Sequence, residues 1–162
     1  ITVASALNDA HVHPRDLGQV IVSLRTHPIR VGHIYDDRKN LIGNSGPFWP
    51  DGDETDFETL SIPPEYTTVT KRQRRIAHFS MEQYKDCLQK LRPDTCFINF
   101  INHFKIKSDL IDFINEIENI ESELGVRTNK LYGTGPMVDD VYDDLNAALD
   151  FFDGEKNQAQ NR

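Results

Sequence analysis

The chain has 162 residues and a formal net charge of -8, with 38% hydrophobic and 27% charged residues. These values fit one compact globular domain and argue against a disordered chain or a general nucleic-acid-binding protein, which is usually basic. No apolar run approaches the roughly 20 residues of a membrane span, no signal-peptide pattern is present, and Cys87 and Cys96 are expected to be free thiols in the cytoplasm.

The first part of the chain predicts a short helix that runs into a strand over residues 16–32, with an apolar run from Val20 to Leu24. Residues 33–66 are rich in glycine and proline and predict a long loop. A loop of this length in a compact domain is usually either functional or disordered.

The middle of the chain alternates between strand and helix patterns. A helix is predicted over residues 80–91, a buried strand follows over 95–101, and a clear amphipathic helix begins at Ser108 as its cap and ends at Gly125. A further strand leads into the turn at 132–136. This order predicts a βαβ unit over residues 95–136, and hence an α/β fold with a mostly parallel sheet.

The end of the chain predicts one more helix over residues 138–152, with apolar residues spaced for one face and six aspartates between 139 and 153. The composition of residues 153–162 predicts a disordered tail. The sequence therefore predicts a single domain over residues 1–152 followed by this tail.

The segment 66–75, YTTVTKRQRR, gathers threonines and four basic residues in an acidic chain. Arginine forks and threonine hydroxyls together suit a carboxylate or phosphate ligand. An exposed basic turn, a nuclear-type signal or a nucleic-acid patch explains the charges equally simply. The hydroxyls favour the anion-binding interpretation slightly, because a sorting signal does not need them.

The sequence YGTGP, Tyr132–Pro136, follows a predicted strand. Ligands of open α/β sheets gather at the carboxyl ends of strands, and glycines allow close approach of a ring or a phosphate. On spacing alone, an ordinary strand-to-helix turn is the simpler interpretation. No GxxxxGK[ST] phosphate loop occurs anywhere in the chain.

The remaining chemical groups predict no site of their own. The six histidines lack a convergent set of metal ligands, and the aspartates of 139–153 fit a solvated helix face better than a metal site. No nucleophile stands beside a recognisable base. We therefore predict no catalytic and no metal-binding residue within this chain.

The motifs HPIRVG, SGPFWPD, YTTVTKRQRR, FINF and YGTGP, in this order and at these gaps, resemble the C-terminal half of the adenylosuccinate synthetase family from about residue 2 to residue 145. The likeness is to its short archaeal and phage forms. It implies part of a fold similar to the P-loop NTPases. It also implies a reaction in which aspartate displaces a phosphorylated 6-oxo group of IMP or dGMP, driven by a nucleoside triphosphate and Mg²⁺.

The resemblance also implies roles for particular residues. The loop similar to the family's aspartate-binding loop contributes Thr68, Thr70, Lys71, Arg72 and Arg74. Binding of the nucleoside monophosphate is expected from Thr2, Arg30, Val31, Gly32 and Arg72.

For the base of the triphosphate, the resemblance implies Asn99, Ile101, Gly133, Thr134, Gly135 and Pro136. Family members usually carry Lys-Leu-Asp where this chain has Asn99-Phe100-Ile101. Isoleucine cannot accept a hydrogen bond from guanine, so ATP or dATP is expected in preference to GTP.

The family's phosphate loop, magnesium site and catalytic residues lie in a half that resembles no part of this sequence, and the chain begins with Ile1. We therefore expect a chain that is inactive alone and acts as a homodimer or with a complementing N-terminal half, in the host cytoplasm if viral, without membrane or nucleic-acid partners. The alternatives are a non-catalytic remnant that binds a nucleotide or a protein partner, and a regulatory or nucleic-acid-binding domain.

Overall fold

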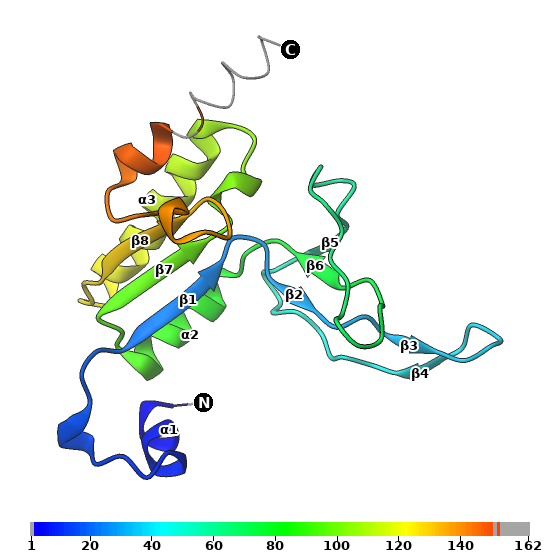
Figure 1. The fold of residues 1–162 in the computed structure, drawn as a ribbon, viewed down its shortest axis with the longest axis horizontal. Coiled ribbons are helices and arrows are strands. Elements are labelled where there is room, and N and C mark those ends of the chain that lie inside the picture. Colours follow the sequence, from blue (N-terminus) through cyan, green and yellow to red (C-terminus); the bar gives the residue numbers. More distant parts are fainter. Residues whose placement is uncertain (1, 151, 153–162) are drawn as a thin grey trace. The chain divides into compact units, whose positions relative to one another are not determined.

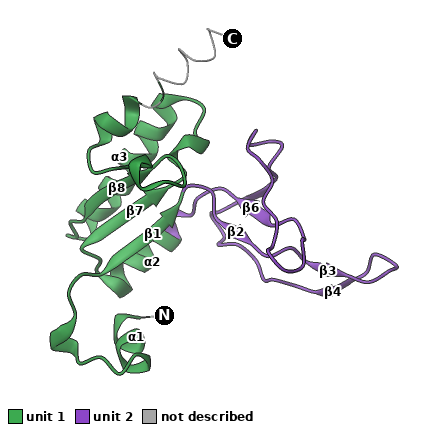
Figure 2. Cartoon of the chain, viewed as in Figure 1, with its two compact units in different colours: residues 1–25, 83–162 green, residues 26–82 purple. Residues whose placement is uncertain are grey.

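The computed structural model describes residues 2–150 and 152 of the chain. These residues form two compact units, shown in Figure 2. Unit 1 combines residues 1–25 with residues 83–162, and unit 2 consists of residues 26–82. The sequence does not predict this division, and the single domain over 1–152 stays a prediction. The predicted tail, 153–162, lies outside the described residues.

Unit 1 is built on a four-stranded sheet with the order β1-β7-β8-β9 (Figure 1). Its strands are β1 (Ile21–Arg25), β7 (Thr95–Asn99), β8 (Asn129–Gly133) and β9 (Val141–Tyr142). The first three are parallel, and β9 is antiparallel to β8. The register pairs Arg25 with Asn99 and Asn99 with Gly133, so the three parallel strands end together. The α/β fold with a mostly parallel sheet is confirmed.

Two helices, α2 (Met81–Leu91) and α3 (Lys107–Glu123), precede β7 and β8 in the chain. They lie side by side, because the hydroxyl of Tyr84 donates to Glu121 at 2.5 Å and Lys85 pairs with Glu123. Their apolar faces and the central strands form the core. Fully buried members are Leu88, Cys96, Ile98, Leu110 and Ile117. The predicted βαβ unit is thus β7-α3-β8.

A buried charge pair anchors α3 to β8. Glu121 is 5% exposed, and its carboxylate accepts hydrogen bonds from Lys130 Nζ at 2.7 and 2.9 Å, and from Thr128 Oγ1 at 2.7 Å. These donors compensate the loss of water around the carboxylate. Burial and the bond to Glu121 raise the pKa of the Tyr84 hydroxyl far above its ordinary value.

The two ends of α3 differ in how well the sequence predicts them. Gly125 has a φ of 60° just after the helix, which is the left-handed terminator expected there. The predicted Ser108 cap is wrong, because the helix begins one residue earlier, at Lys107, and Ile106 occupies the cap position without a side-chain bond. The hydroxyl of Ser108 instead donates to Asp109 at 3.3 Å.

The predicted helix over 138–152 is wrong in its first half. Residues Val138–Asp140 form a 3-10 turn, Val141–Tyr142 form β9, and helical structure begins only at Leu145. The backbone of Asp140 explains this, because its carbonyl accepts the N–H of Thr134 at 2.9 Å and so closes the turn that brings β9 back against β8.

The start of the chain also differs from the prediction. Residues Val3–Asp9 form the helix α1, which is not predicted from the sequence. The short helix predicted from Asp16 is wrong, because a 3-10 turn, Pro14–Asp16, ends there and residues 17–20 form no helix. No residue of α1 is buried in the described structure. The apolar period that identifies a packed helix is therefore missing from this segment.

Unit 2 is loop-rich, as predicted, with short strands that the sequence does not reveal. One sheet has the order β2-β6-β5, formed by Ile29–Arg30, Arg75–Ala77 and Glu54–Thr55, and all its pairs are antiparallel. Strands β3 (Ile34–Tyr35) and β4 (Leu41–Gly43) form a separate hairpin. The small core of this unit contains Phe57, Ile62 and Ile76, against which Ile29 and Leu60 pack.

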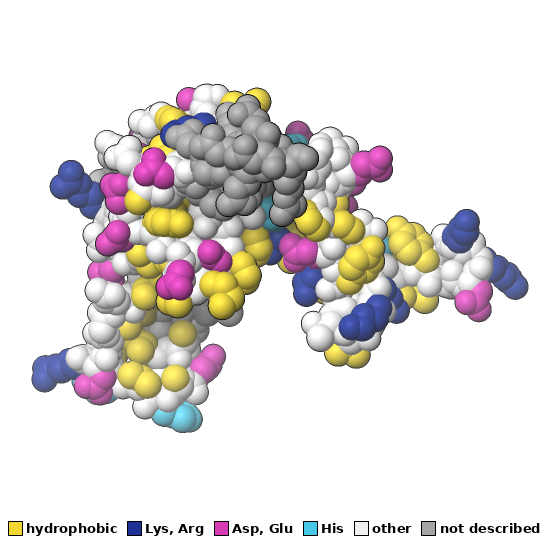
Figure 3. All heavy atoms as spheres, turned by 45° about the horizontal axis from the view of Figure 1, so that its top comes forward, with side chains coloured by type: hydrophobic (Ala, Val, Ile, Leu, Met, Phe, Trp, Pro, Cys, Tyr) yellow, Lys and Arg dark blue, Asp and Glu magenta, His cyan; other side chains and the backbone are white. Residues whose placement is uncertain are grey.

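Several large apolar side chains of the β3–β4 hairpin are exposed. Figure 3 shows hydrophobic side chains along this part of the surface, followed by basic side chains at its end. The exposed apolar residues include Ile34, Tyr35, Leu41 and Ile42, the last of which is 65% exposed. The hairpin therefore contributes little apolar burial to unit 2.

Arg75 connects the loops of unit 2 to the strand β6. Its guanidinium is paired bidentately with the carboxylate of Glu54 and also donates to Ser45 Oγ at 2.8 Å and to the carbonyl of Gly46 at 2.7 Å. It lies 5.1 Å from the ring centre of Phe48. Because the apolar core is small, these polar contacts determine where the segment 44–55 runs.

Among the residues that the structure describes, no helix is long and apolar enough to cross a membrane.

The pair of Arg75 and Glu54 predicts an acid-sensitive contribution to stability. The hydrogen bond from Arg75 holds the pKa of Glu54 below its ordinary 4.5. Its contribution is therefore present above that pH and lost as the pH falls through the lowered pKa. Because Glu54 is 45% exposed, we expect Glu54→Gln to lower the free energy of unfolding by only about 1–2 kcal/mol near neutral pH.

Urea unfolding at about pH 7 and about pH 3 tests this, with the difference between wild type and Glu54→Gln expected to shrink in acid. The matched control is Glu58→Gln, because Glu58 is exposed and forms no ion pair among the described residues. A difference that is equal at both pH values contradicts the assignment.

Candidate functional site

The basic segment 66–75 is an ordered, tight turn in the structure. Tyr66 and Gln73 form a bridge at its base, and the backbone of Thr67 bonds to Arg72 and to Lys71. Thr67 Oγ1 lies 2.5 Å from Thr70 Oγ1 and accepts the N–H of Arg72 at 3.0 Å. Lys71 completes the turn with a φ of 52°. Two of the threonines thus shape the turn itself.

The tip of this turn presents unsatisfied donors. Among the described residues, no group accepts a hydrogen bond from the backbone N–H of Thr68, Val69 or Thr70. Val69 is 90% exposed, and Thr68 is also exposed. Successive unbonded N–H groups at a turn form a concavity that favours an anion.

The four basic residues of the segment divide into two groups. Arg75 is committed to Glu54 and the loop 44–55. The side chains of Lys71, Arg72 and Arg74, in contrast, have no carboxylate within ion-pair distance in the described part of the chain. The same turn therefore carries three uncompensated cations and the free N–H groups, and a dicarboxylate or phosphate ligand requires both charge and donors.

Gly32 lies directly against this turn. A Cβ atom at position 32 would be 2.5 Å from the carbonyl oxygen of Gln73 and 3.9 Å from the Cβ of Arg72. The strands support the same neighbourhood, because Arg30 of β2 pairs with Arg75 of β6. The structure therefore brings the predicted segment Arg30–Gly32 to the predicted aspartate-binding turn, within unit 2.

The predicted phosphate-binding residues have different surroundings. The guanidinium of Arg30 donates to the carbonyl of Ser45 through Nε at 2.9 Å and through a second nitrogen at 2.5 Å, while Val31 is 51% exposed. Thr2 lies in unit 1, where its hydroxyl accepts the N–H of Ser5 at 3.2 Å and caps α1.

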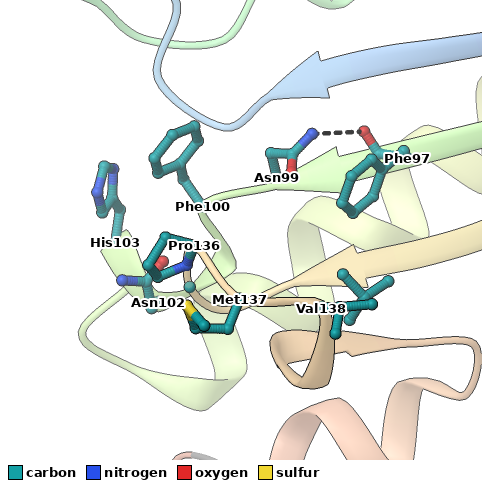
Figure 4. A pocket seen from close by; sticks show the side chains of 10 residues that line it. Phe97, Asn99, Phe100, Asn102, His103, Pro136, Met137 and Val138 are labelled. Carbon is teal, nitrogen blue, oxygen red and sulfur yellow. Dashed lines mark hydrogen bonds between the residues drawn. The ribbon is translucent and has the colours of Figure 1, made fainter.

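Unit 1 contains a pocket of about 530 Å³ at the carboxyl ends of β7 and β8 (Figure 4). Its walls come from β7, from the 3-10 turn Ile101–His103 that follows it, and from the segment 135–141. The lining residues are Phe97, Asn99, Phe100, Asn102, His103, Gly135, Pro136, Met137, Val138 and Val141.

The predicted triphosphate-base residues fall on or beside this pocket in different ways. Asn99, Gly135 and Pro136 line it. Gly133 lies close to the Asn99 side chain, because a Cβ atom at position 133 would be 2.9 Å from Asn99 Oδ1. Thr134 is buried and bonds to the Asp140 carbonyl. Ile101 is fully buried and does not line the pocket.

Sequence reasoning missed most of the aromatic and apolar lining, which includes Phe97, Phe100, Met137 and Val138. The rule that ligands gather at the ends of parallel strands points to these segments but does not select side chains. The conformation of Phe100 is a further feature of this pocket that the sequence does not reveal. Phe100 has a φ of 66°, which is unusual for a bulky residue, and Arg25 lies 4.0 Å from its ring centre.

The described residues include no group of three or more His, Cys, Asp or Glu side chains that could hold a metal ion. A magnesium ion of the kind that the family resemblance implies therefore finds no fitting ligand set in this part of the chain. We assign no chemical step to a metal held by these residues.

Comparison with known proteins identifies relatives of the chain, although no family model matches it. The N6-succino-2-amino-2'-deoxyadenylate synthase of Salmonella phage PMBT28 is 39% identical over 145 residues, which are 86% of this chain and 39% of that protein. The adenylosuccinate synthetase of Methanococcus aeolicus is 31% identical over 156 residues, covering 88% of this chain and 41% of that protein.

A solved structure gives the same result. The succinoaminodeoxyadenylate synthetase of cyanophage S-2L, bound to dGMP and to dATP as an energy donor, matches with a TM-score of 0.77 and 33% identity. The match covers 94% of this chain and 41% of that one. The chain thus spans about two fifths of the length of these relatives. The resemblance to phage and archaeal members of the family is confirmed.

The contact between Gly32 and the turn predicts a specific sensitivity. We expect Gly32→Ala to lower the free energy of unfolding of unit 2 by about 1–3 kcal/mol, because the new methyl group must displace backbone. Urea unfolding and amide exchange of residues 66–75 measure the effect. Gly18→Ala is the matched control, since no atom lies within 4 Å of a Cβ there. Equal behaviour of the two variants contradicts the contact.

Proposed function

Because the chain is homologous over most of its length to the adenylosuccinate synthetase family, we propose that it is part of a ligase that joins L-aspartate to a purine nucleoside monophosphate. A nucleoside triphosphate drives the reaction by phosphorylating the 6-oxo group, which the aspartate amine then displaces. The phage relatives suggest dGMP as the monophosphate, and the archaeal relatives leave IMP as the alternative.

The turn 66–75 supplies the aspartate-binding part in this proposal. The observation that carries it is the combination of three unpaired cations with three unbonded N–H groups at one exposed turn. Aspartate carries two carboxylates, and each requires charge and hydrogen-bond donors once water is removed. Arg72 and Arg74 provide planar forks, Lys71 a point charge, and Thr68 and Thr70 hydroxyl groups.

The monophosphate is assigned to Arg30, Val31 and Gly32, with Arg72 at the ribose and Thr2 at the phosphate. Support comes from the contact of Gly32 with the turn, which places the backbone of residue 32 beside Arg72. A glycine lets a nucleotide approach the backbone closely. The assignment of Thr2 rests on the resemblance alone.

The base of the triphosphate is assigned to the pocket of unit 1. Its lining combines aromatic and apolar side chains with a few amides, as pockets for flat organic ligands do. None of the ten lining residues is an aspartate or glutamate. Guanine presents two neighbouring N–H donors that a carboxylate would accept, so this lining favours ATP or dATP over GTP. The dATP bound by the cyanophage relative supports the same choice.

The remaining parts of such a ligase are assigned to segments outside these 162 residues. The sequence contains no phosphate-loop motif, and the chain spans about two fifths of its relatives. In this proposal the Mg²⁺ site and the groups that transfer protons belong to the other three fifths, in the same chain or in a complementing one. The enzyme acts in the cytoplasm, as a homodimer or a complemented assembly.

Aspartate binding can be tested at Arg72. We expect Arg72→Ala to weaken aspartate about 10- to 100-fold, because a charge-assisted hydrogen bond contributes roughly 1.5–3 kcal/mol. The measurement is the aspartate KM of the complete or complemented enzyme, together with aspartate titration of the 162-residue protein.

Arg38→Ala is the matched control for this substitution. Arg38 is exposed on the β3–β4 hairpin, and its side chain has no partner among the described residues. An Arg72→Ala enzyme whose aspartate KM and kcat equal those of the Arg38→Ala enzyme overturns the assignment of the turn.

A further inference from the structure

The pocket of unit 1 contains a polar group that the protein itself leaves unsatisfied. Asn102 Oδ1 is buried and accepts no hydrogen bond from any described residue. A buried oxygen without a donor costs about 1–3 kcal/mol. Such groups are rare in folded proteins and each requires an explanation. Because Asn102 also lines the pocket, a bound ligand is the direct candidate for its missing partner.

The backbone after β7 directs Asn102 to the pocket. Phe100 adopts a left-handed conformation, with a φ of 66°, and the 3-10 turn Ile101–His103 follows at once. This turn places Ile101 fully in the core and Asn102 on the pocket wall. Figure 4 shows Asn102 on the segment after β7 and Pro136 on the segment after β8, and both line the pocket. Of the neighbours Ile101 and Asn102, Asn102 lines the pocket and Ile101 does not.

The second amide in the pocket, that of Asn99, has hydrogen-bond partners within the protein. Asn99 Nδ2 donates to Ser23 Oγ at 2.8 Å and lies 3.5 Å from the Phe97 carbonyl. A carbonyl only accepts, so these partners fix which atom of the Asn99 amide is the nitrogen. Asn102 has no such partners. Its terminal torsion is broad and roughly two-fold, so its amide can turn to match a ligand.

We propose that the Asn102 carboxamide determines the base specificity of this pocket by reading the N6 and N7 edge of adenine. The inference rests on the proposed function and deepens it. The amide oxygen accepts from the N6 amino group while the amide nitrogen donates to N7, a pairing for which asparagine geometry is suited. Guanine presents two acceptors, O6 and N7, on this edge, so one end of the amide would face an acceptor unpaired.

The apolar part of the lining cannot perform this task. Phe97, Pro136, Met137 and Val138 provide apolar surface for a flat ring but cannot distinguish an amino group from an oxygen. The buried oxygen receives a hydrogen bond only when the base carries the amino group. The difference in affinity between the bases is therefore large, because the wrong base leaves a desolvated acceptor unpaired.

The test removes the 6-amino group from the ligand and, separately, the amide from residue 102. Binding of adenosine and of purine riboside, which lacks the 6-amino group, is measured by calorimetry for the wild-type 162-residue protein and for Asn102→Ala. We expect the wild type to bind adenosine about 5- to 100-fold more tightly than purine riboside, and Asn102→Ala to bind the two nucleosides with similar affinity. Asn115→Ala, at an exposed position of α3, serves as the control and keeps the wild-type ratio.

The ratio separates specificity from a change in folding, because a damaged pocket loses both nucleosides alike. Asn102→Asp provides a second variant, which retains an acceptor for N6 but repels N7. Because N7 is present in both nucleosides, we expect this variant to bind both more weakly but to keep most of the preference for adenosine. If the wild type binds adenosine but Asn102→Ala keeps its preference over purine riboside, the inference is wrong while the proposed pocket stands. If the wild type binds neither nucleoside, both the assigned pocket and the inference are overturned.

Discussion

The guanidinium of Arg75 is the contact on which unit 2 depends most. The apolar core there is limited to a few residues around Ile76, so the loops cannot be held by burial alone. Arg75 compensates by bonding Glu54, Ser45 and Gly46 from the end of the turn 66–75. Arg75 and Arg30, which donates to the Ser45 carbonyl, thus hold the loop 44–55. The other three cations of the segment form no ion pair among the described residues.

The proposed base-binding pocket of unit 1 is formed in a different way. A parallel sheet aligns the carboxyl ends of β1, β7 and β8, and the register brings Asn99 beside Gly133. The tight turns that follow β7 and β8 then supply the pocket walls. A rigid sheet therefore positions the proposed nucleotide-base pocket, whereas hydrogen bonds between loops position the proposed aspartate-binding turn.

The elements that the sequence predicts well are those with strong local patterns. The βαβ unit and the terminator Gly125 follow from apolar periodicity and from a required positive φ. The division into two units, α1 and the strand at Val141 are missed, because they depend on pairings and on packing that leave no period in the sequence. The basic segment was identifiable as an anion-binding candidate, but only the structure separates Arg75 from its neighbours. Asn102 could not be selected, because its significance lies in a hydrogen bond that is missing.

The central claim is that this chain carries an anion-binding turn for aspartate in unit 2 and a base-binding pocket in unit 1. Hydrogen–deuterium exchange of the 162-residue protein tests it most directly, with aspartate and dGMP added in one experiment and dATP in another. We expect aspartate and dGMP to protect residues 66–75 and 30–32, and dATP to protect residues 97–103 and 133–141. Unchanged exchange in these segments, or protection confined to other parts of the chain, would contradict it.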